Sequence, residues 1–431
     1  MTDRPALAVV YDQGPASPSD LAVSLAERMS CVFVVPANAH TASVTPLLGT
    51  FGPVVTVDTA DNVDAVAEQL RGHGVRGIVT YTEQVQRLTA ELAERLGLRF
   101  HTPATAELLT DKWLQRAALR AAGLDAVRSA RIDAPGDWER AAATVGFPAV
   151  LKPVHGAASG NTFYVADADS GRDLAARVLE LPAPGLVVGG GLVLEEYLPG
   201  RDCAPFGDYV SVEHAVIDGV VTDIAVTGKL PMVAPFRETG RFWPSPFTPE
   251  ENDELRALAA RAVLALGIRH GITHTEIKLT PAGPRLIEVN GRLGGGIQDL
   301  AVRAAGLDLI ELAARICLGE GVAPRLPAIE RVYYQAFHPA PRRPCVLVEH
   351  LGGEAVRALA GVDLCRFFLR PGQQVPGGVG TWELGQVYGV VPDHDALVAL
   401  LKEVDDLLRF RFAFPGESEP TTVSRAGLGE L

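Results

Sequence analysis

The stretch that decides the fold covers residues 272–296 and reads ITHTEIKLTPAGPRLIEVNGRLGGG. Two short segments with alternating apolar residues flank the Pro- and Gly-rich run 281–284, which is typical of a tight turn. The pattern predicts a β-hairpin, with Glu276 on its first strand and Glu288 and Asn290 on its second. Side chains two residues apart on a strand share a face, and the hairpin returns Glu276 towards that face.

The oxygen donors of this hairpin form a hard ligand set. Two carboxylates and an amide carbonyl suit Mg²⁺ or Mn²⁺, which keep some waters and take further ligands from phosphate. Arg292 follows two residues later, and its guanidinium suits a phosphoryl or carboxylate oxygen. The glycines 294–296 let backbone N–H groups approach an anion closely. The alternative is an ordinary strand whose Glu-x-Asn side chains face solvent.

The composition is that of an ordinary globular protein. The chain has 431 residues, 47% of them hydrophobic and 21% charged, and its net charge is −13. This charge argues against nucleic acid as a partner, and an anionic ligand must be held by local positive charge. The five cysteines are scattered without a CxxC pair, which argues against a zinc site or a disulfide framework and predicts a cytoplasmic location. We expect no signal peptide and no membrane-spanning segment.

Residues 1 to about 105 alternate short β-rich runs with helical ones. Strands are expected at 6–11, 31–35, 54–57 and 77–82, and helices at 20–29, 61–72 and 83–96. This alternation predicts a parallel sheet. No GxGxxG follows the first strand and no GxxxxGKS or GxxxxGKT occurs, so dinucleotide-binding and P-loop functions lack their phosphate-binding glycines.

Two lysines and a glycine-rich loop follow. Lys112 opens a strong helix, expected at 113–122, and Lys152 lies on an apolar strand at 149–153. The loop 155–162, HGAASGNT, offers N–H groups and hydroxyls that suit phosphate. A solvated lysine and an ordinary hairpin are the alternatives for Lys112 and the loop.

A strand that runs into a Pro-Gly break lies at 192–200, LVLEEYLPG. Such a hinge offers an edge N–H and C=O that suit a purine. We expect Glu195 to accept a hydrogen bond from the purine's amino group.

In this order, the pieces resemble the ATP-grasp superfamily. The resembling stretch covers residues 111 to about 321, and the front α/β domain also fits. The family pattern is a DK helix, a VLKP strand, a glycine-rich lid loop, an EEYL hinge, then Glu, Glu-x-Asn and Arg. Each piece is weak by itself, and their order and spacing carry the assignment.

The resemblance implies roles for the matching residues. Those implied to bind ATP are Lys112, Lys152, Ser159, Gly160, Glu195, Glu196 and Leu198. Those implied to hold the metal are Glu276, Glu288 and Asn290. Lys152 and Arg292 are the implied catalytic residues, with Arg292 steadying an acyl phosphate.

One position departs from the family pattern. The family carries an acidic residue on the strand soon after the hinge, in contact with ribose or a lysine, but 201–207 reads as an insertion here. Asp208 and Glu213 therefore both remain candidates for this ATP-binding role, and Lys229 is a further implied ATP-binding residue.

Within the superfamily, the L-amino acid ligases are the subgroup that the chain resembles most. The resemblance rests on Lys229, on FRETGRFWPS at 236–245, and on RLGGG with GLDLIEL downstream. It implies that Glu238 contacts the substrate amino group, that Arg241 lies nearby, and that Arg292 and Gly295 border the same substrate. A surface loop is the alternative interpretation of residues 238–243.

The sequence therefore predicts an α/β ATP-grasp ligase that uses ATP and Mg²⁺ (or Mn²⁺). An amino acid or related carboxylate is activated as an acyl phosphate, an amine displaces phosphate, and ADP is released. The alternatives are an ATP-dependent carboxylase of the biotin carboxylase kind and a nucleotide-binding regulator without turnover. A homodimer is expected, because dimers are frequent among proteins that resemble this one.

Five segments are predicted. They are an N-terminal α/β domain (1–108), a linking helix (109–126), a lid subdomain (127–199), a C-terminal mixed-sheet domain (200–414) and a tail (415–431). The C-terminal domain includes short strands and a helix expected at 396–408. The tail is rich in Gly, Ser and Thr and is expected to be disordered.

Overall fold

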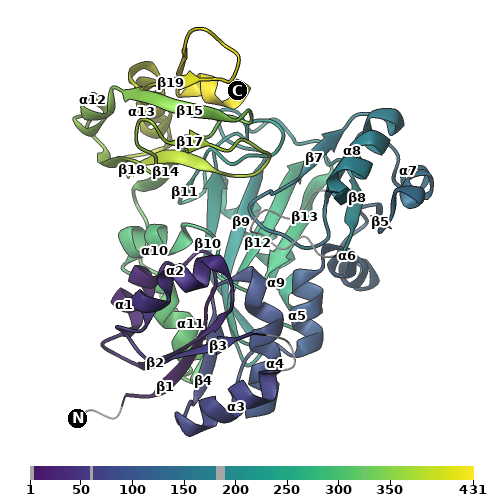
Figure 1. The fold of residues 1–431 in the computed structure, drawn as a ribbon, viewed down its shortest axis with the longest axis vertical. Helices are drawn as coiled ribbons and strands as arrows, with labels where there is room; N and C mark the ends of the chain where they lie inside the picture. Colours follow the sequence, from purple (N-terminus) through teal and green to yellow (C-terminus); the bar gives the residue numbers. More distant parts are fainter. Residues whose placement is uncertain (1–3, 59–61, 181–189, 325) are drawn as a thin grey trace.

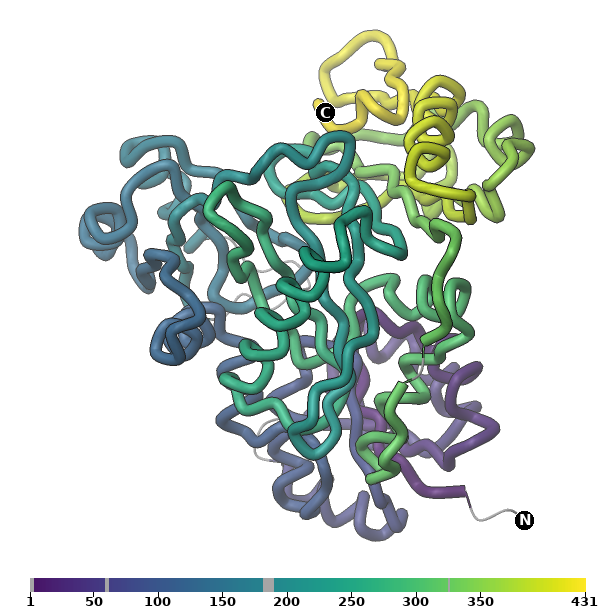
Figure 2. Tube along the Cα trace, turned by 180° about the vertical axis from the view of Figure 1, so that it is seen from behind, coloured from purple at the N-terminus to yellow at the C-terminus, as the bar shows by residue number. Residues whose placement is uncertain are grey.

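A computed structural model describes residues 4–58, 62–180, 190–324 and 326–431 and arranges them around four sheets (Figure 1). A long central sheet connects an N-terminal α/β layer at one end to a small C-terminal sheet at the other, with a lid subdomain beside it. The two ends of the chain lie at opposite ends of the molecule, as the view from behind also shows (Figure 2). No helix among the described residues is long and apolar enough to cross a membrane.

The N-terminal sheet is parallel, with the order β3-β2-β1-β4, as the alternating pattern predicts. Its strands are nearly all apolar because helices cover both faces. One face packs on α3 and α4, and the other packs on α1 and on α11, which comes from far along the chain. Helix α1 (Pro18–Leu25) is shorter than the helix expected at 20–29. The helix expected at 61–72 corresponds to α3 (Val63–Gly72), and its expected first residue, Asp61, lies outside the described residues. The strands are Ala6–Val10, Ser30–Pro36, Val54–Val57 and Gly77–Thr80, and the helices α1–α4 are Pro18–Leu25, Ala39–Leu48, Val63–Gly72 and Gln86–Leu96.

Two consecutive helices, α5 (Pro103–Thr110) and α6 (Lys112–Ala121), lead into the lid subdomain. Asp111 separates them, and its side chain caps α6 by accepting from the backbone N–H of Leu114 at 2.9 Å. This cap fixes Lys112 as the first helical residue, so its side chain starts from a defined position.

The lid subdomain is an antiparallel sheet with the order β5-β8-β6-β7, covered by two helices. Trp138, fully buried, anchors the helices to the sheet. Its elements are β5 Ser129–Ile132, α7 Trp138–Val145, β6 Ala149–Pro153, β7 Phe163–Val165, α8 Ala168–Glu180 and β8 Leu192–Glu196.

The central sheet has eight strands in the order β13-β12-β9-β10-β11-β14-β18-β16. The hairpin predicted from residues 272–296 forms its edge as β12 and β13. We expected a mixed sheet, but every described pairing is antiparallel. Helix α9 (Pro249–Ala265) covers one face, and α10 (Ile297–Ala305) and α11 (Leu309–Cys317) connect to the N-terminal layer. The strands are β9 Tyr209–Ile217, β10 Val220–Lys229, β11 Gly240–Trp243, β12 Gly271–Thr280, β13 Gly283–Asn290, β14 Val332–Pro339, β16 Val362–Phe367 and β18 Glu383–Val391.

The C-terminal sheet has the order β17-β15-β19-β20 and includes the end of the chain. The expectation of a disordered tail is wrong, because β20 pairs with β19 and Leu428 is fully buried. The prediction followed the polar composition of the tail and gave too little weight to the few apolar residues that anchor it. The domain boundaries predicted above stay a prediction. The elements are β15 Cys345–Leu351, α12 Gly353–Arg357, β17 Gln374–Val375, α13 His394–Leu407, β19 Arg409–Ala413 and β20 Thr421–Ser424.

Candidate functional site

A cavity of about 540 Å³ opens where the lid, the central hairpin and the N-terminal layer meet. It gathers residues from positions 13 to 383 of the chain. The candidate site residues that line it are Lys112, Lys152, Ser159, Gly160, Glu195, Glu196, Leu198, Lys229, Glu238, Arg241, Glu276, Glu288, Asn290, Arg292 and Gly295.

The two candidate metal carboxylates lie directly opposite each other. Glu276 on β12 pairs with Glu288 on β13, and His274 pairs with Asn290. Burial would raise the pKa of Glu276, but the hydrogen bond and charge of His274 and the charges of Lys229 and Lys112 outweigh it and lower that pKa to about 2. Glu276 is therefore a permanent anion at the cavity wall.

The donor set fits a hard cation that brings its own further ligands. The described residues hold no cluster of three His, Cys, Asp or Glu side chains that would enclose a metal by themselves. Two carboxylates and the amide oxygen of Asn290 instead match Mg²⁺, which keeps waters and takes phosphate oxygens. That amide oxygen accepts from Nη2 of Arg292 at 3.1 Å, so the arginine lies beside the same set.

Lys112 lies between the hairpin and the lid loop. Its Nζ is 2.7 Å from Glu288 Oε1 and 2.7 Å from the carbonyl oxygen of Gly156. Burial disfavours the ammonium, but the charge and hydrogen bond of Glu288 prevail, and the pKa of Lys112 is raised. The cation thus connects the lid loop to the hairpin that carries the candidate metal carboxylates.

Glu195 lies in the cavity wall among basic side chains, and its ATP-binding role stays a prediction. Its carboxylate accepts hydrogen bonds from Nε and Nη2 of Arg116 at 3.0 and 3.1 Å and lies 2.8 Å from Nζ of Lys152. Burial opposes the charge, but Arg116 and Lys152 outweigh it and lower the pKa of Glu195 to about 2. The carboxylate therefore faces basic side chains, and it holds Lys152 in the cavity.

The lid loop has an unusual backbone. Ala158, Ser159 and Asn161 adopt φ of 55°, 54° and 52°, a left-handed conformation that costs energy for residues with a side chain. Two hydrogen bonds hold the loop to the C-terminal part: the N–H of Asn161 donates to Val379 O at 3.0 Å, and the N–H of Thr381 donates to Ala158 O at 2.8 Å. The loop is therefore closed over the cavity against the segment 379–381.

Glu238 lies between two cations at the substrate end of the cavity. Its Oε1 accepts from Lys229 and its Oε2 from Nη2 of Arg241, both at 2.7 Å. Burial opposes ionisation, but Lys229 and Arg241 outweigh it and lower the pKa of Glu238. The trio carries a net positive charge, which favours a carboxylate near it.

The remaining acidic candidates lie outside the cavity lining. Asp208 pairs with Lys278 at 2.7 Å, and it is Lys278 that faces the cavity. Glu213 is fully buried behind His274, whose Nδ1 lies 2.9 Å from its Oε2. Asp208 thus contacts a lysine and Glu213 a histidine, and which of the two residues takes the ATP-binding role stays a prediction.

Five further charged residues at the cavity escaped the sequence interpretation: Glu83, Arg116, His274, Lys278 and Glu383. Arg116 lies one helical turn after Lys112 on α6, a spacing that would have allowed its prediction. His274 and Lys278 lie two residues before and after Glu276 on β12, so the strand period would have placed them on its face. Glu83 and Glu383 carry no motif signal, since only tertiary contacts bring them to the cavity.

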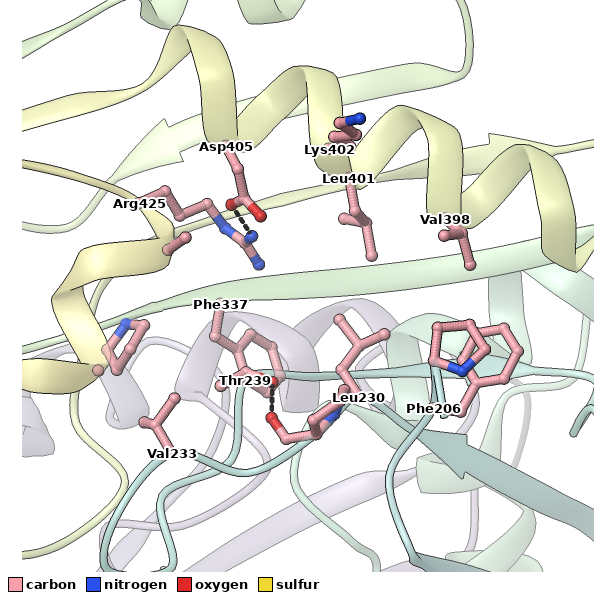
Figure 3. A pocket seen from close by; sticks show the side chains of 15 residues that line it. Phe206, Leu230, Val233, Thr239, Phe337, Val398, Leu401, Lys402, Asp405 and Arg425 are labelled. Atoms are coloured by element: carbon pink, nitrogen blue, oxygen red, sulfur yellow. Dashed lines mark hydrogen bonds and ion pairs between the residues drawn. The ribbon is translucent and has the colours of Figure 1, made fainter. Parts of the chain in front are cut away.

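A second cavity of about 290 Å³ lies between the β10–β11 connection and α13 (Figure 3). Phe206, Leu230 and Leu401 give it apolar walls, and its buried Arg425 pairs with Asp405. It shares no residue with the larger cavity and gathers no set of catalytic groups.

No family model matches the chain. Human carnosine synthase 1 is 30% identical over 342 residues, covering 74% of this chain and 40% of that protein. Alanine–anticapsin ligase of Bacillus subtilis (strain 168) is 28% identical over 358 residues, covering 74% of this chain and 76% of that protein. The chain thus spans about two fifths of the length of the human relative.

A solved structure of L-amino acid ligase from Bacillus licheniformis has a TM-score of 0.72 and 21% identity, covering 94% of this chain and 98% of that one. In fold and in sequence the chain is similar to ligases of the ATP-grasp superfamily. Within it, the homologues are carnosine synthase and alanine–anticapsin ligase.

Proposed function

We propose that the chain is an ATP-dependent ligase that joins the carboxylate of an amino acid, or a related acid, to an amine. The observation that carries the proposal is the pairing of Glu276 with Glu288 in one cavity with Lys112, Lys152 and Arg292. Two opposed carboxylates suit a metal–phosphate complex, and three cations around them suit a phosphoryl group in transfer. The names of the sequence relatives agree with this reaction class.

The metal would be held by Glu276, Glu288 and Asn290. Bound Mg²⁺ would neutralise the phosphate charge that builds up during transfer. Lys152, kept in place by Glu195, and Lys112, at the lid, would bind phosphate oxygens.

Arg292 would orient the carboxylate that attacks the γ-phosphoryl group. Its guanidinium is already fixed by the carbonyl of Leu293, by Asn290 and by Glu83, so little freedom is lost when substrate binds. Water would destroy the resulting acyl phosphate. The lid loop over the cavity would keep water out of the site. An amine then attacks the acyl carbon and phosphate leaves.

Amino acids are the proposed substrate class. The trio of Lys229, Glu238 and Arg241 gives the cavity both signs of charge beside Arg292. A zwitterion finds partners for its ammonium and its carboxylate in such a cavity. A homodimer and a cytoplasmic location remain predictions.

The test is a matrix of amino acids supplied in pairs with ATP and Mg²⁺. Phosphate release and product mass are measured in parallel. We expect phosphate release that depends on amino acid and a product lighter than the two substrates together by one water. Phosphate release that requires bicarbonate instead would favour the carboxylase alternative, and nucleotide binding without turnover would favour a regulator.

A further inference from the structure

Glu383 is a charged group of the cavity that the proposed mechanism leaves unused. It is the first residue of β18 and lines the cavity beside Thr381 and Trp382. Its carboxylate makes no hydrogen bond or ion pair of 4.0 Å or less with any described side chain. The other glutamates that line the cavity each face a basic group: Glu83 faces Arg292, Glu195 faces Arg116, Glu196 faces Arg128, Glu238 faces Lys229, Glu276 faces His274 and Glu288 faces Lys112.

The surroundings of Glu383 favour a cationic ligand. Its burial is the main influence and raises the pKa of Glu383 to about 7, against the charges of Arg241 and Arg366 and with that of Glu238. Glu383 is half-buried and its carboxylate has no charged partner, so an ammonium group at the cavity wall would supply one. Such an isolated acid at a cavity wall is a common feature of ligand sites.

Arg241 offers the complementary charge in the same cavity. Its Nη2 is bonded to Glu238, while its Nη1 makes no hydrogen bond among the described residues. This Nη1 faces Gly295 and Gly296: a Cβ built on these glycines would lie 3.7 and 3.4 Å from it. At Gly295, which lines the cavity, no other atom lies within 4 Å of that position, so the absence of a side chain leaves Nη1 accessible from the cavity.

Arg241 and Glu383 both line the cavity but do not form an ion pair with each other. Their charged groups therefore lie more than 4.0 Å apart, although the charge of Arg241 acts to lower the pKa of Glu383. A small molecule with an ammonium at one end and a carboxylate at the other can bridge such a separation.

We propose that Glu383 and Arg241 bind the second substrate, the one that supplies the amine, as an amino acid zwitterion. This inference rests on the proposed ligase function and assigns the site of its nucleophile. The ammonium lies at Glu383 and the carboxylate at Nη1 of Arg241. The nucleophile is thus an amino acid with a free carboxylate, rather than a simple amine.

The position of Glu383 also connects the nucleophile to lid closure. The segment 379–381 that precedes it accepts from Asn161 and donates to Ala158 of the lid loop. Phe236 and Trp382 line the cavity nearby and offer apolar surface for the side chain of the bound amino acid. A closed lid and a bound nucleophile would therefore stabilise the same segment.

The experiment compares three nucleophiles with wild type, Glu383→Gln and the control Glu403→Gln, an exposed glutamate on α13. The nucleophiles are an amino acid, the amide of that amino acid, and hydroxylamine, which is uncharged near neutral pH and traps an acyl phosphate as a hydroxamate. Initial rates are measured at varied nucleophile and at a fixed, saturating concentration of the carboxylate substrate.

We expect the wild type to prefer the amino acid to its amide by about tenfold or more, since an ion pair to Arg241 is lost. Glu383→Gln should raise the KM for the amino acid by about tenfold or more, while its ATP-dependent hydroxamate yield falls by much less. Glu403→Gln should match the wild type. A wild type that accepts the amide as well as the amino acid removes Arg241 from the proposal.

Two negative results have different meanings. If the wild type forms neither product nor hydroxamate with any amino acid, the proposed ligase function fails. If the wild type is active and Glu383→Gln keeps its KM for the amino acid, or loses hydroxamate formation to the same extent as amino acid ligation, only the assignment of Glu383 fails.

Discussion

The carboxylate of Glu83 lies 2.6 Å from Nε of Arg292, although 209 residues separate them in the chain. Both side chains are about nine-tenths buried. Burial raises the pKa of Glu83, and the charge of Glu288 adds to this, against the attraction of Arg292 and Lys112. The N-terminal layer thus reaches into the cavity and fixes the arginine that the proposed reaction uses.

Glu83→Gln should therefore lower turnover without weakening ATP binding. The amide keeps the size of the side chain but loses the charge that orients Arg292, and we expect kcat to fall by about tenfold or more. Steady-state kinetics with each substrate varied provide the measurement. Glu94→Gln, an exposed substitution on α4, is the matched control. An unchanged kcat would show that Arg292 is positioned without Glu83.

Glu288→Gln tests the metal set. If Glu288 binds the cation, turnover should fall on the order of 10² or more, because a neutral amide is a poor Mg²⁺ ligand and Lys112 loses its partner. The measurement is phosphate release at several Mg²⁺ concentrations. Chelation of the metal should abolish phosphate release by the wild type.

The fold must survive for this result to count. Melting temperatures of Glu288→Gln and of Glu254→Gln, an exposed control on α9, provide that check. Near-normal turnover with unchanged melting would remove Glu288 from the metal set.

Nucleotide should protect the lid loop 155–162 from hydrogen exchange. The loop is attached to the C-terminal part by the two hydrogen bonds that join Ala158 and Asn161 to the segment 379–381, so both segments should gain protection together. Exchange is followed by mass spectrometry with and without a non-hydrolysable ATP analogue. Equal protection of the loop in both states would contradict a lid function.

Local pattern was sufficient for the parts of the site that lie on one hairpin or one helix. Alternation around a Pro-Gly turn predicted a hairpin that returns Glu276 towards the face of Glu288, and the strand–helix alternation predicted the parallel sheet. The ion pair of Glu195 with Arg116 was not predicted, because Arg116 lies 79 residues away and no local rule reveals such a contact. Glu83 and Glu383 reach the cavity through domain packing alone, which a single sequence does not encode in any short motif.

Glu238→Ala should mainly raise the KM for the amino acid substrate and leave the KM for ATP close to unchanged. Glu238 holds Lys229 and Arg241 at 2.7 Å each, and the resemblance to amino acid ligases links it to the substrate amino group. Without it, two buried cations repel each other, and the substrate end of the cavity loses its geometry. The ATP-phosphate lysines Lys112 and Lys152 keep their own carboxylates and should be unaffected.

Steady-state kinetics that vary ATP and the amino acid separately decide this, with Glu238→Gln as a second variant that keeps the volume of the side chain. We expect the KM for the amino acid to rise by about tenfold or more in both variants, in line with the loss of a desolvated charge contact. A melting curve shows whether the alanine variant remains folded. If the KM for ATP rises sharply while the amino acid dependence stays constant, Glu238 belongs to the nucleotide site, and the substrate end of the cavity must lie elsewhere.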